Sequence, residues 1–241
     1  MEWIVEIDGD SLDLDWLLKG PTFPEFSIQK EDEKYFLISD EFKNCSSYSE
    51  VKDTVTELLA IISVGCQLCL GSDKKISIKQ VTEIRDDGKK YTPIEATVKI
   101  KFRGIATITN RHPDGNEDPV IYPAELIRRY IHLVNQDPQV AKAFRYIFYD
   151  FSSPTGLGNI IEILEDDQFE PVTGGKYHKD CNNITGSLNN PTVSGVYARH
   201  AKPQKGRRPP QKTVPISEAQ SIITSILKDW LLQKESHYNI K

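Results

Sequence analysis

The sequence has few cysteines, no long apolar run and no recognisable leader. Four irregularly spaced cysteines are too few to cross-link 241 residues, so reduced thiols are expected. No stretch approaches the roughly 18 consecutive apolar residues that span a bilayer. The N-terminus opens on Met-Glu-Trp and acids, not on the basic and then apolar stretch of a signal peptide. We therefore expect a cytoplasmic protein that has no membrane partner.

Signatures of cofactor and metal sites are also missing. The short motif Gly156-Leu-Gly158 lacks both the lysine and the preceding strand of a nucleotide-binding loop. Neither His112 nor His132 has a second ligand at metal spacing, and the pair Cys66 and Cys69 has no second pair. Since both cysteines end an apolar helical run, we expect them to pack in a core. The sequence predicts no cofactor and no metal site.

Charge is unevenly distributed along the chain, although the net charge is only −5. Residues 1–57 contain fifteen acids and five bases, whereas residues 171–241 contain eleven bases and four acids. A basic C-terminal region would attract a phosphate-rich partner, and an acidic N-terminal region would repel it, so contact with nucleic acid would be one-sided. Docking of the acidic half on the basic half of the same chain is an equally open interpretation.

The first part of the chain, residues 1–109, predicts an α+β domain in which an antiparallel sheet is covered by at least one helix. Apolar residues at steps of three and four from residue 51 predict that helix, with Ser49 as its cap. Residues 31–34 predict a four-residue hairpin loop, and Asp87-Gly88 predicts a second turn. The expected strands are residues 3–7, 26–30, 35–39, 76–84 and 96–108.

Beyond a linker at 110–122, rich in turn-forming residues, the period of the apolar residues becomes helical. Residues 123–241 predict an all-α domain, a bundle of about four helices. Asp137-Pro138 supplies a cap and a first-turn proline for the second helix, and Ser217 and Gln220 form a capping box for the last. The predicted loop at 166–215 is long enough to be functional or disordered. The expected helices are residues 123–135, 138–148, 157–165 and about 217–231.

The long loop contains most of the reactive side chains. A histidine can accept and donate protons near neutral pH, and an arginine can neutralise charge that develops on a phosphate. His178, Arg199 and His200 are therefore the candidate catalytic residues for phosphodiester cleavage. The same residue types also bind phosphate without chemistry, and a solvated surface role remains open. The candidate nucleic-acid contacts are Lys202, Lys205, Arg207 and Arg208.

The C-terminal half resembles the HEPN superfamily over roughly residues 123–235. The resemblance rests on Ile160-Ile-Glu-Ile-Leu164 in a helix, the Arg199-His200 pair and the helix start at Val214-Pro-Ile-Ser-Glu-Ala219. It implies a metal-independent RNase of a toxin-antitoxin, abortive-infection or other prokaryotic defence system, which acts as a homodimer. Arg199 would then stabilise the phosphate, and His200 would be the polar residue that follows it.

The sequence departs from the HEPN pattern where the closing histidine is expected. Gln204, Lys205 and Gly206 occupy those positions. This leaves a non-catalytic bundle, a rearranged site in which His200 or His178 takes the proton, or a likeness limited to the helices. The N-terminal α+β part matches no family.

Two functions therefore follow from the sequence. The first is a HEPN-like protein that binds RNA or another nucleic acid through the basic loop at 199–212 and has a residual RNase activity. The alternative is a non-catalytic module that binds a protein partner, in which 199–212 is a solvated connector. Prolines favour the second interpretation because they keep a segment extended and outside packed elements; they stand at positions 203, 209, 210 and 215.

Overall fold

The structure is a computed structural model, which describes residues 2–85, 90–91, 122–194, 198 and 212–240. The chain divides into two compact units, residues 1–131 and residues 132–241. Of the expected linker at 110–122, only Tyr122 is described. The first half of α3 (Pro123–Gln136) belongs to the first unit because Ala124, Ile127 and Ile131 are part of its apolar core.

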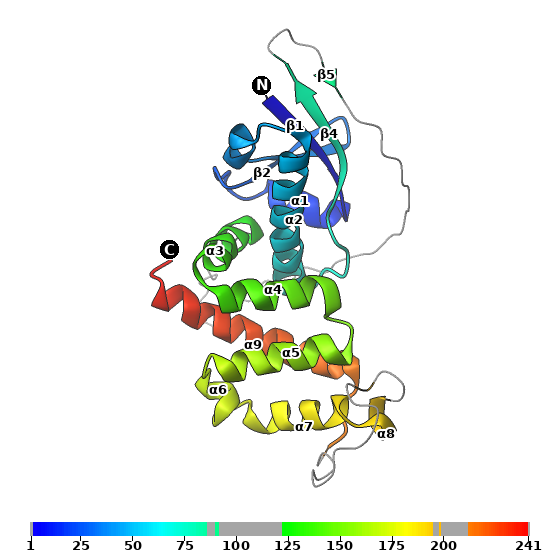
Figure 1. The fold of residues 1–241 in the computed structure, drawn as a ribbon, viewed down its shortest axis with the longest axis vertical. Coiled ribbons are helices and arrows are strands. Elements are labelled where there is room, and N and C mark those ends of the chain that lie inside the picture. Colours follow the sequence, from blue (N-terminus) through cyan, green and yellow to red (C-terminus); the bar gives the residue numbers. More distant parts are fainter. Residues whose placement is uncertain (1, 86–89, 92–121, 195–197, 199–211, 241) are drawn as a thin grey trace, which may run out of the picture. The chain divides into compact units, whose positions relative to one another are not determined.

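The first unit contains a five-stranded antiparallel sheet in the order β2-β3-β1-β4-β5, which confirms the expected class of this part (Figure 1). Along the chain the elements alternate as β1-α1-β2-β3-α2-β4, the split β-α-β arrangement. The strands are β1 (Glu2–Asp8), β2 (Ser27–Glu31), β3 (Lys34–Ile38), β4 (Ser77–Ile84) and β5 (Lys90–Tyr91), and the helices are α1 (Ser11–Leu18), a 3-10 turn (Asp40–Asn44) and α2 (Tyr48–Leu70).

One apolar core joins a single face of this sheet to the helices. Val5 and Leu37 from the strands, Leu14 from α1 and Val55 from α2 are all less than 2 % exposed and belong to the same cluster. Gly65 brings α3 close to α2, since a Cβ atom there would lie 2.3 Å from Cγ1 of Ile127. The described helices of this unit therefore pack against one face of the sheet.

Helix α2 is long and apolar enough to cross a membrane when judged by length and composition alone. Half of its most apolar 18-residue window is buried inside the structure, and the buried core helix of a globular domain passes the same test. Cys66 is fully buried in the core, as expected, whereas Cys69 is partly exposed.

The local details of the first unit differ from the sequence predictions at three points. The hairpin turn has two residues, because Asp32 and Glu33 both adopt positive φ angles, 45° and 64°, which allows Glu31 and Lys34 to pair. The α2 cap is Ser47, whose hydroxyl accepts from the Glu50 amide, so the predicted Ser49 cap is wrong. Helix α1 was not predicted, and the strand expected at 96–108 lies outside the described residues.

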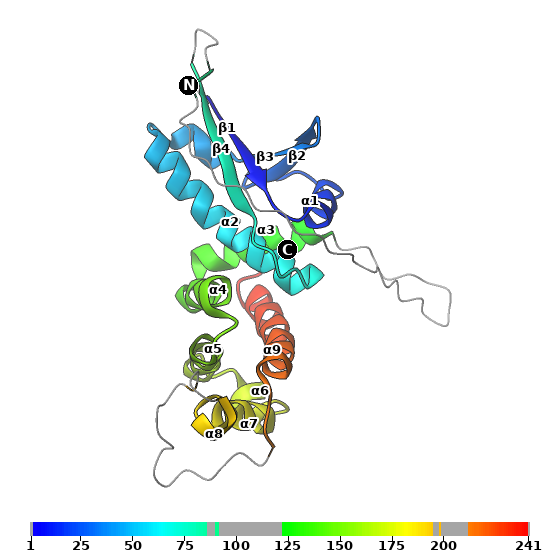
Figure 2. The same ribbon diagram turned by 90° about the vertical axis from the view of Figure 1, so that its right-hand side faces the viewer.

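The second unit is helical, as predicted for this part of the chain. Helix α5 contacts α4, α7 and α9, and in Figure 1 it lies between α4 and α7. Its side chains from Leu157 to Leu164 include five large aliphatic residues that are no more than 1 % exposed. The elements are α4 (Pro138–Asp150), α5 (Pro154–Asp166), α6 (Glu170–Thr173), α7 (His178–Leu188), α8 (Pro191–Ser194) and α9 (Ile216–His237) (Figure 2).

The predicted loop at 166–215 is wrong as far as residue 194, because this part contains α6, α7 and α8. Cys181, Ile184 and Leu188 recur at steps of three and four on α7 and are buried, so a short apolar stripe holds this helix in the core. The capping box of α9 is also not formed. Pro215 occupies the cap position without a side-chain hydrogen bond, and Gln220 donates instead to the Phe151 carbonyl at 3.0 Å.

Candidate functional site

His178 is the one residue of the predicted site that lies in the described part of the chain. It begins α7, and its side chain is exposed. The other two candidate catalytic residues, Arg199 and His200, lie outside the described residues. The four predicted nucleic-acid contacts also lie outside them; these are Lys202, Lys205, Arg207 and Arg208.

The hydrogen bonds of His178 assign a tautomer to its ring. Nδ1 lies 3.0 Å from the carbonyl oxygen of Val172, and a carbonyl oxygen only accepts, so Nδ1 carries the hydrogen. The side-chain amide of Asn182 lies 3.0 Å from Nε2 and donates to it. Nε2 is thus the basic nitrogen, and it becomes available to another proton donor when the exposed Asn182 side chain moves away.

Neither Val172 nor the pairing of Asn182 with His178 was predicted from the sequence. Residues four apart on a helix meet on one face, so the spacing of His178 and Asn182 is a usable signal once α7 is recognised as a helix. The carbonyl of Val172 comes from the end of α6, and this contact depends on the packing of α6 against α7.

Helix α7 also holds the chain where it re-enters the described structure after the basic stretch. The Lys212 amide donates to Oδ1 of Asn183 at 3.4 Å, and the Val214 amide donates to the Ser187 hydroxyl at 3.0 Å. Val214 and Ser187 are both buried. At the other end, α8 follows α7 after two residues and contacts it. Residues 195–211 therefore connect two points that are both attached to α7.

The stretch from 195 to 211 contains five lysines and arginines and no acid. Near α7 the described lysines, Lys176 and Lys179, differ in whether an acid neutralises their charge. Lys176 lies 2.6 Å from Asp229, and Tyr177 donates to the same carboxylate at 2.7 Å. The hydrogen bonds from Lys176 and Tyr177 lower the pKa of Asp229 and keep it charged, so this acid neutralises Lys176. Lys179 is exposed beside His178.

Cys181 is the thiol nearest to His178 along the chain, and its environment excludes a nucleophilic role. Its side chain is 2 % exposed. Burial, with smaller contributions from Glu165 and Asp180, raises its pKa to about 12. The thiol therefore stays protonated at neutral pH, and only a thiolate is an effective nucleophile.

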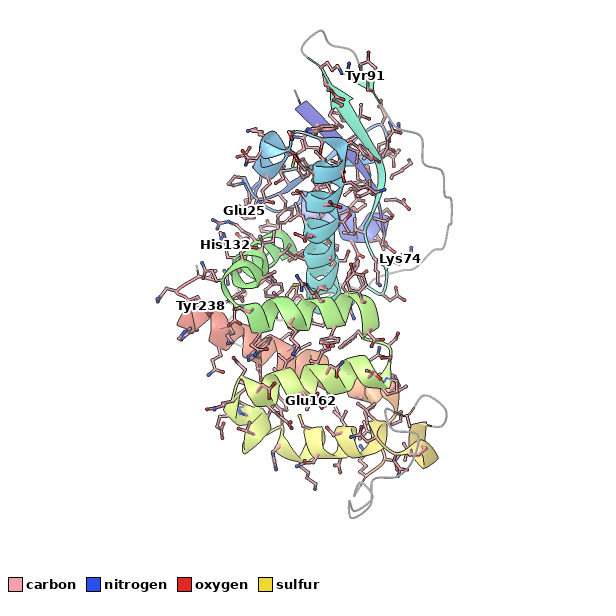
Figure 3. The ribbon with its side chains drawn as sticks, viewed as in Figure 1. Glu25, Lys74, Tyr91, His132, Glu162 and Tyr238 are labelled. Atoms are coloured by element: carbon pink, nitrogen blue, oxygen red, sulfur yellow. The ribbon has the colours of Figure 1, made fainter. Side chains whose placement is uncertain are left out.

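A second polar cluster, which the sequence did not predict, lies around Lys234 on α9. Its ammonium group is 2.7 Å from Oδ2 of Asp137 and 2.7 Å from Oδ1 of Asp167. Trp230 donates to the other oxygen of Asp167 at 2.7 Å, and Tyr238, near the end of the chain in Figure 3, donates to Asp137 at 3.2 Å. The polar groups of this Lys234 cluster (Asp137, Asp167, Trp230, Lys234 and Tyr238) therefore satisfy one another. The cluster is a structural link between the start of α4 and the ends of α5 and α9.

Among the described residues, no three His, Cys, Asp or Glu side chains are placed so that they could hold a metal ion. The sequence matches no protein-family model, and no curated protein or solved structure is detectably similar to it.

Proposed function

We propose that this protein binds RNA, or another single-stranded nucleic acid, through the basic stretch at 199–212 on its helical unit. The observation that carries the proposal is the run of five cations without an acid between 195 and 211, whose flanking residues are attached to α7. Cations at this density displace the counterions of a phosphate backbone, and the released ions favour binding.

The arrangement of the helices supports a HEPN-like interpretation of this unit. The four longest helices that lie wholly within it, α4, α5, α7 and α9, would be the bundle, and α5 contacts each of the other three. In the HEPN pattern the arginine motif precedes the last long helix, and Arg199-His200 precedes α9 in this chain. By this likeness the protein belongs to a prokaryotic defence or toxin-antitoxin type of system.

Binding to a short single-stranded oligouridylate should be strongly salt-dependent. If each of the five cations neutralises one phosphate, log K falls with log[salt] at a slope of about −3.5, and affinity decreases roughly 100-fold between about 50 and about 200 mM salt. Replacing Lys205, Arg207 and Arg208 by alanine should reduce the slope to about −1.4. Fluorescence anisotropy over a salt series measures both slopes.

A matched control removes three exposed cations from other helices of the same unit, Lys142, Arg145 and Lys228. This variant has the same net charge as the first, and its slope should stay at the wild-type value. Equal slopes for the two triple variants, or an affinity that does not change with salt, would contradict the proposal and leave a protein-binding module as the better interpretation.

The tautomer of His178 favours a catalytic version of this function, in which Nε2 removes the proton of a 2′-hydroxyl. The 2′-oxygen then attacks the adjacent phosphorus, the 5′-oxygen leaves and takes up a proton from solvent, and the product carries a 2′,3′-cyclic phosphate. Cleavage of oligouridylate should therefore proceed in EDTA, and the corresponding DNA, which lacks the 2′-hydroxyl, should remain intact. His178→Ala should abolish cleavage without changing the affinity.

Asn182→Ala is the matched control for His178→Ala, because it removes the donor to Nε2 and leaves the base in place. We expect it to retain cleavage. If wild-type protein binds oligouridylate without cleaving it, or if His178→Ala cleaves normally, His178 is not the base and only the binding function remains. Cyclic-phosphate ends on the products can be identified by mass spectrometry.

A further inference from the structure

Tyr149 presents an aromatic ring to solvent in the last turn of α4. Its side chain is 69 % exposed, the highest value among the large apolar and aromatic side chains of the described residues. The ring stands perpendicular to that of Phe148, with the two ring centroids 4.8 Å apart, so this contact orients it while most of its surface stays exposed. One exposed ring is common on protein surfaces. The surroundings of Tyr149 therefore decide what it can bind.

The end of α4 lies at the same end of the helical unit as the basic stretch. The Gln220 side chain, near the start of α9, donates to the carbonyl of Phe151 just after α4 at 3.0 Å. The Val214 amide, just before α9, donates to the Ser187 hydroxyl near the end of α7 at 3.0 Å. In Figure 1 the end of α4, the start of α9 and α8 all lie on the right-hand side of this unit. Residues 195–211 therefore leave and re-enter the described structure at the end of the unit where α4 finishes.

A bound strand of moderate length can contact both the basic stretch and α4. Helix α5 packs between α7 and α4, and at about 8–10 Å between packed helices α4 lies roughly 20 Å from α7. About six nucleotides span this distance at about 3.4 Å each. A strand longer than the short oligouridylate of the salt series therefore reaches α4. Helix α4 carries no Asp or Glu before Asp150, so it does not repel the phosphates of such a strand.

We propose that Tyr149 stacks on an unpaired base of a strand that the basic stretch holds, an inference that rests on the proposed function. Every base has a flat aromatic face, so stacking on an exposed ring stabilises the binding of a single strand without selecting its sequence. Tyr146 lies one turn earlier on the same face of α4 and is partly exposed, which extends the aromatic surface. The preferred ligand is therefore a single strand, because the bases of a duplex are already stacked on one another.

Replacing Tyr149 by alanine should weaken the binding of an oligouridylate of about 15 residues roughly tenfold, an effect typical of one stacked base. The loss should be the same at low and at high salt, because stacking releases no counterions and leaves the slope of log K against log[salt] unchanged. Tyr149→Phe keeps the ring and should bind like the wild type. Tyr149→Leu keeps apolar bulk without the ring and should bind like Tyr149→Ala. Fluorescence anisotropy measures all four proteins.

Leu232→Ala is the matched control for the loss of exposed apolar surface in this unit. Leu232 is 56 % exposed on α9. It lies toward the opposite end of the unit, where Lys234 on the same helix contacts Asp137 at the start of α4. This variant should bind oligouridylate like the wild type. The melting temperature of each variant is measured first, and Tyr149→Leu replaces Tyr149→Ala in the comparison if the alanine variant does not fold.

A strand without bases separates stacking from every other effect of the Tyr149 variants. An abasic ribose-phosphate strand of the same length keeps the phosphates, so the wild type and Tyr149→Ala should bind it with equal affinity. If Tyr149→Ala binds oligouridylate like the wild type, or loses as much affinity for the abasic strand, the stacking inference is wrong, and the wild-type salt slope still supports the basic stretch. If the wild type binds neither strand, the proposed function and this inference both fail.

Discussion

The Lys234→Met variant is expected to unfold with a free energy about 3 kcal/mol lower than that of the wild type. Methionine keeps most of the volume of the lysine side chain but removes the ammonium group between Asp137 and Asp167. The side chains of these acids are only 5 % and 20 % exposed, so water replaces the lost contacts poorly. Urea unfolding followed by circular dichroism at neutral pH measures the difference.

Lys176→Met is the matched control for this variant. Lys176 also pairs with an aspartate, Asp229, at 2.6 Å, but both side chains are well exposed. Water solvates the remaining carboxylate, so the free energy of unfolding should hardly change. If the two methionine variants lose the same stability, burial is not what makes the Lys234 cluster important.

The pH dependence of the Lys234 cluster has a definite sign. Burial alone would raise the pKa of Asp137, but the hydrogen bonds from Lys234 and from the amides of Val140 and Gln139 outweigh it and lower the pKa below its ordinary value of 3.8. A depressed carboxyl pKa contributes stability above 3.8, and this contribution is lost as the pH falls through the folded value.

The lysine of the cluster has the opposite behaviour. Burial opposes the charge of Lys234, yet the hydrogen bonds to Asp137 and Asp167 raise its pKa above the ordinary 10.5. Its contribution is complete below 10.5 and is lost as the pH rises through the folded value. The wild type and Lys234→Met should therefore differ most between about pH 4 and about pH 10, and the difference should shrink in acid.

Gly156→Ala is expected to lower the free energy of unfolding by about 2 kcal/mol. Three residues join α4 to α5, and this short connection brings the carbonyl of Asp150 against the first turn of α5. A Cβ atom at position 156 would lie 2.0 Å from that carbonyl oxygen, which is backbone and cannot rotate away. The higher helix propensity of alanine, worth about 1 kcal/mol, offsets only part of the cost.

Gly174→Ala provides the comparison for Gly156→Ala within the same unit. A Cβ atom at Gly174 would meet no atom within 4 Å, so the change should stay within about 0.5 kcal/mol. Chemical unfolding of both variants tests the pair. A tolerated alanine at 156 would mean that the connection between α4 and α5 relaxes without cost.

The regular spacing of apolar residues made most helices and strands predictable. The apolar stripes of α2, α4, α5 and α9 and the cap at Asp137 were readable because each depends on residues a few positions apart. Helix α7 was missed because its three buried apolar residues are separated by Asn, Thr, Gly and Ser, which are weak helix formers. Its helical form depends on packing against α5 and α9.

Details at the ends of elements were predicted less well. Several serines precede α2, and each of them could cap it. Ser47 rather than Ser49 is the cap because of where the chain leaves the preceding 3-10 turn. The two-residue turn at Asp32 and Glu33 was missed because neither residue is a glycine, and positive φ angles are uncommon for other residues.

The sequence by itself determined the division into an α+β part and a helical part, the main helices and the concentration of cations before α9, because these depend on local periodicity and composition. Only the tertiary structure decided that β1 lies inside the sheet, that the hydrogen on the His178 ring is on Nδ1, and that Lys234 joins Asp137 and Asp167. Each of these brings together groups from separate elements, in the case of Lys234 from 97 and 67 residues away. Such contacts are selected by the burial of the whole core, which no short stretch of sequence encodes.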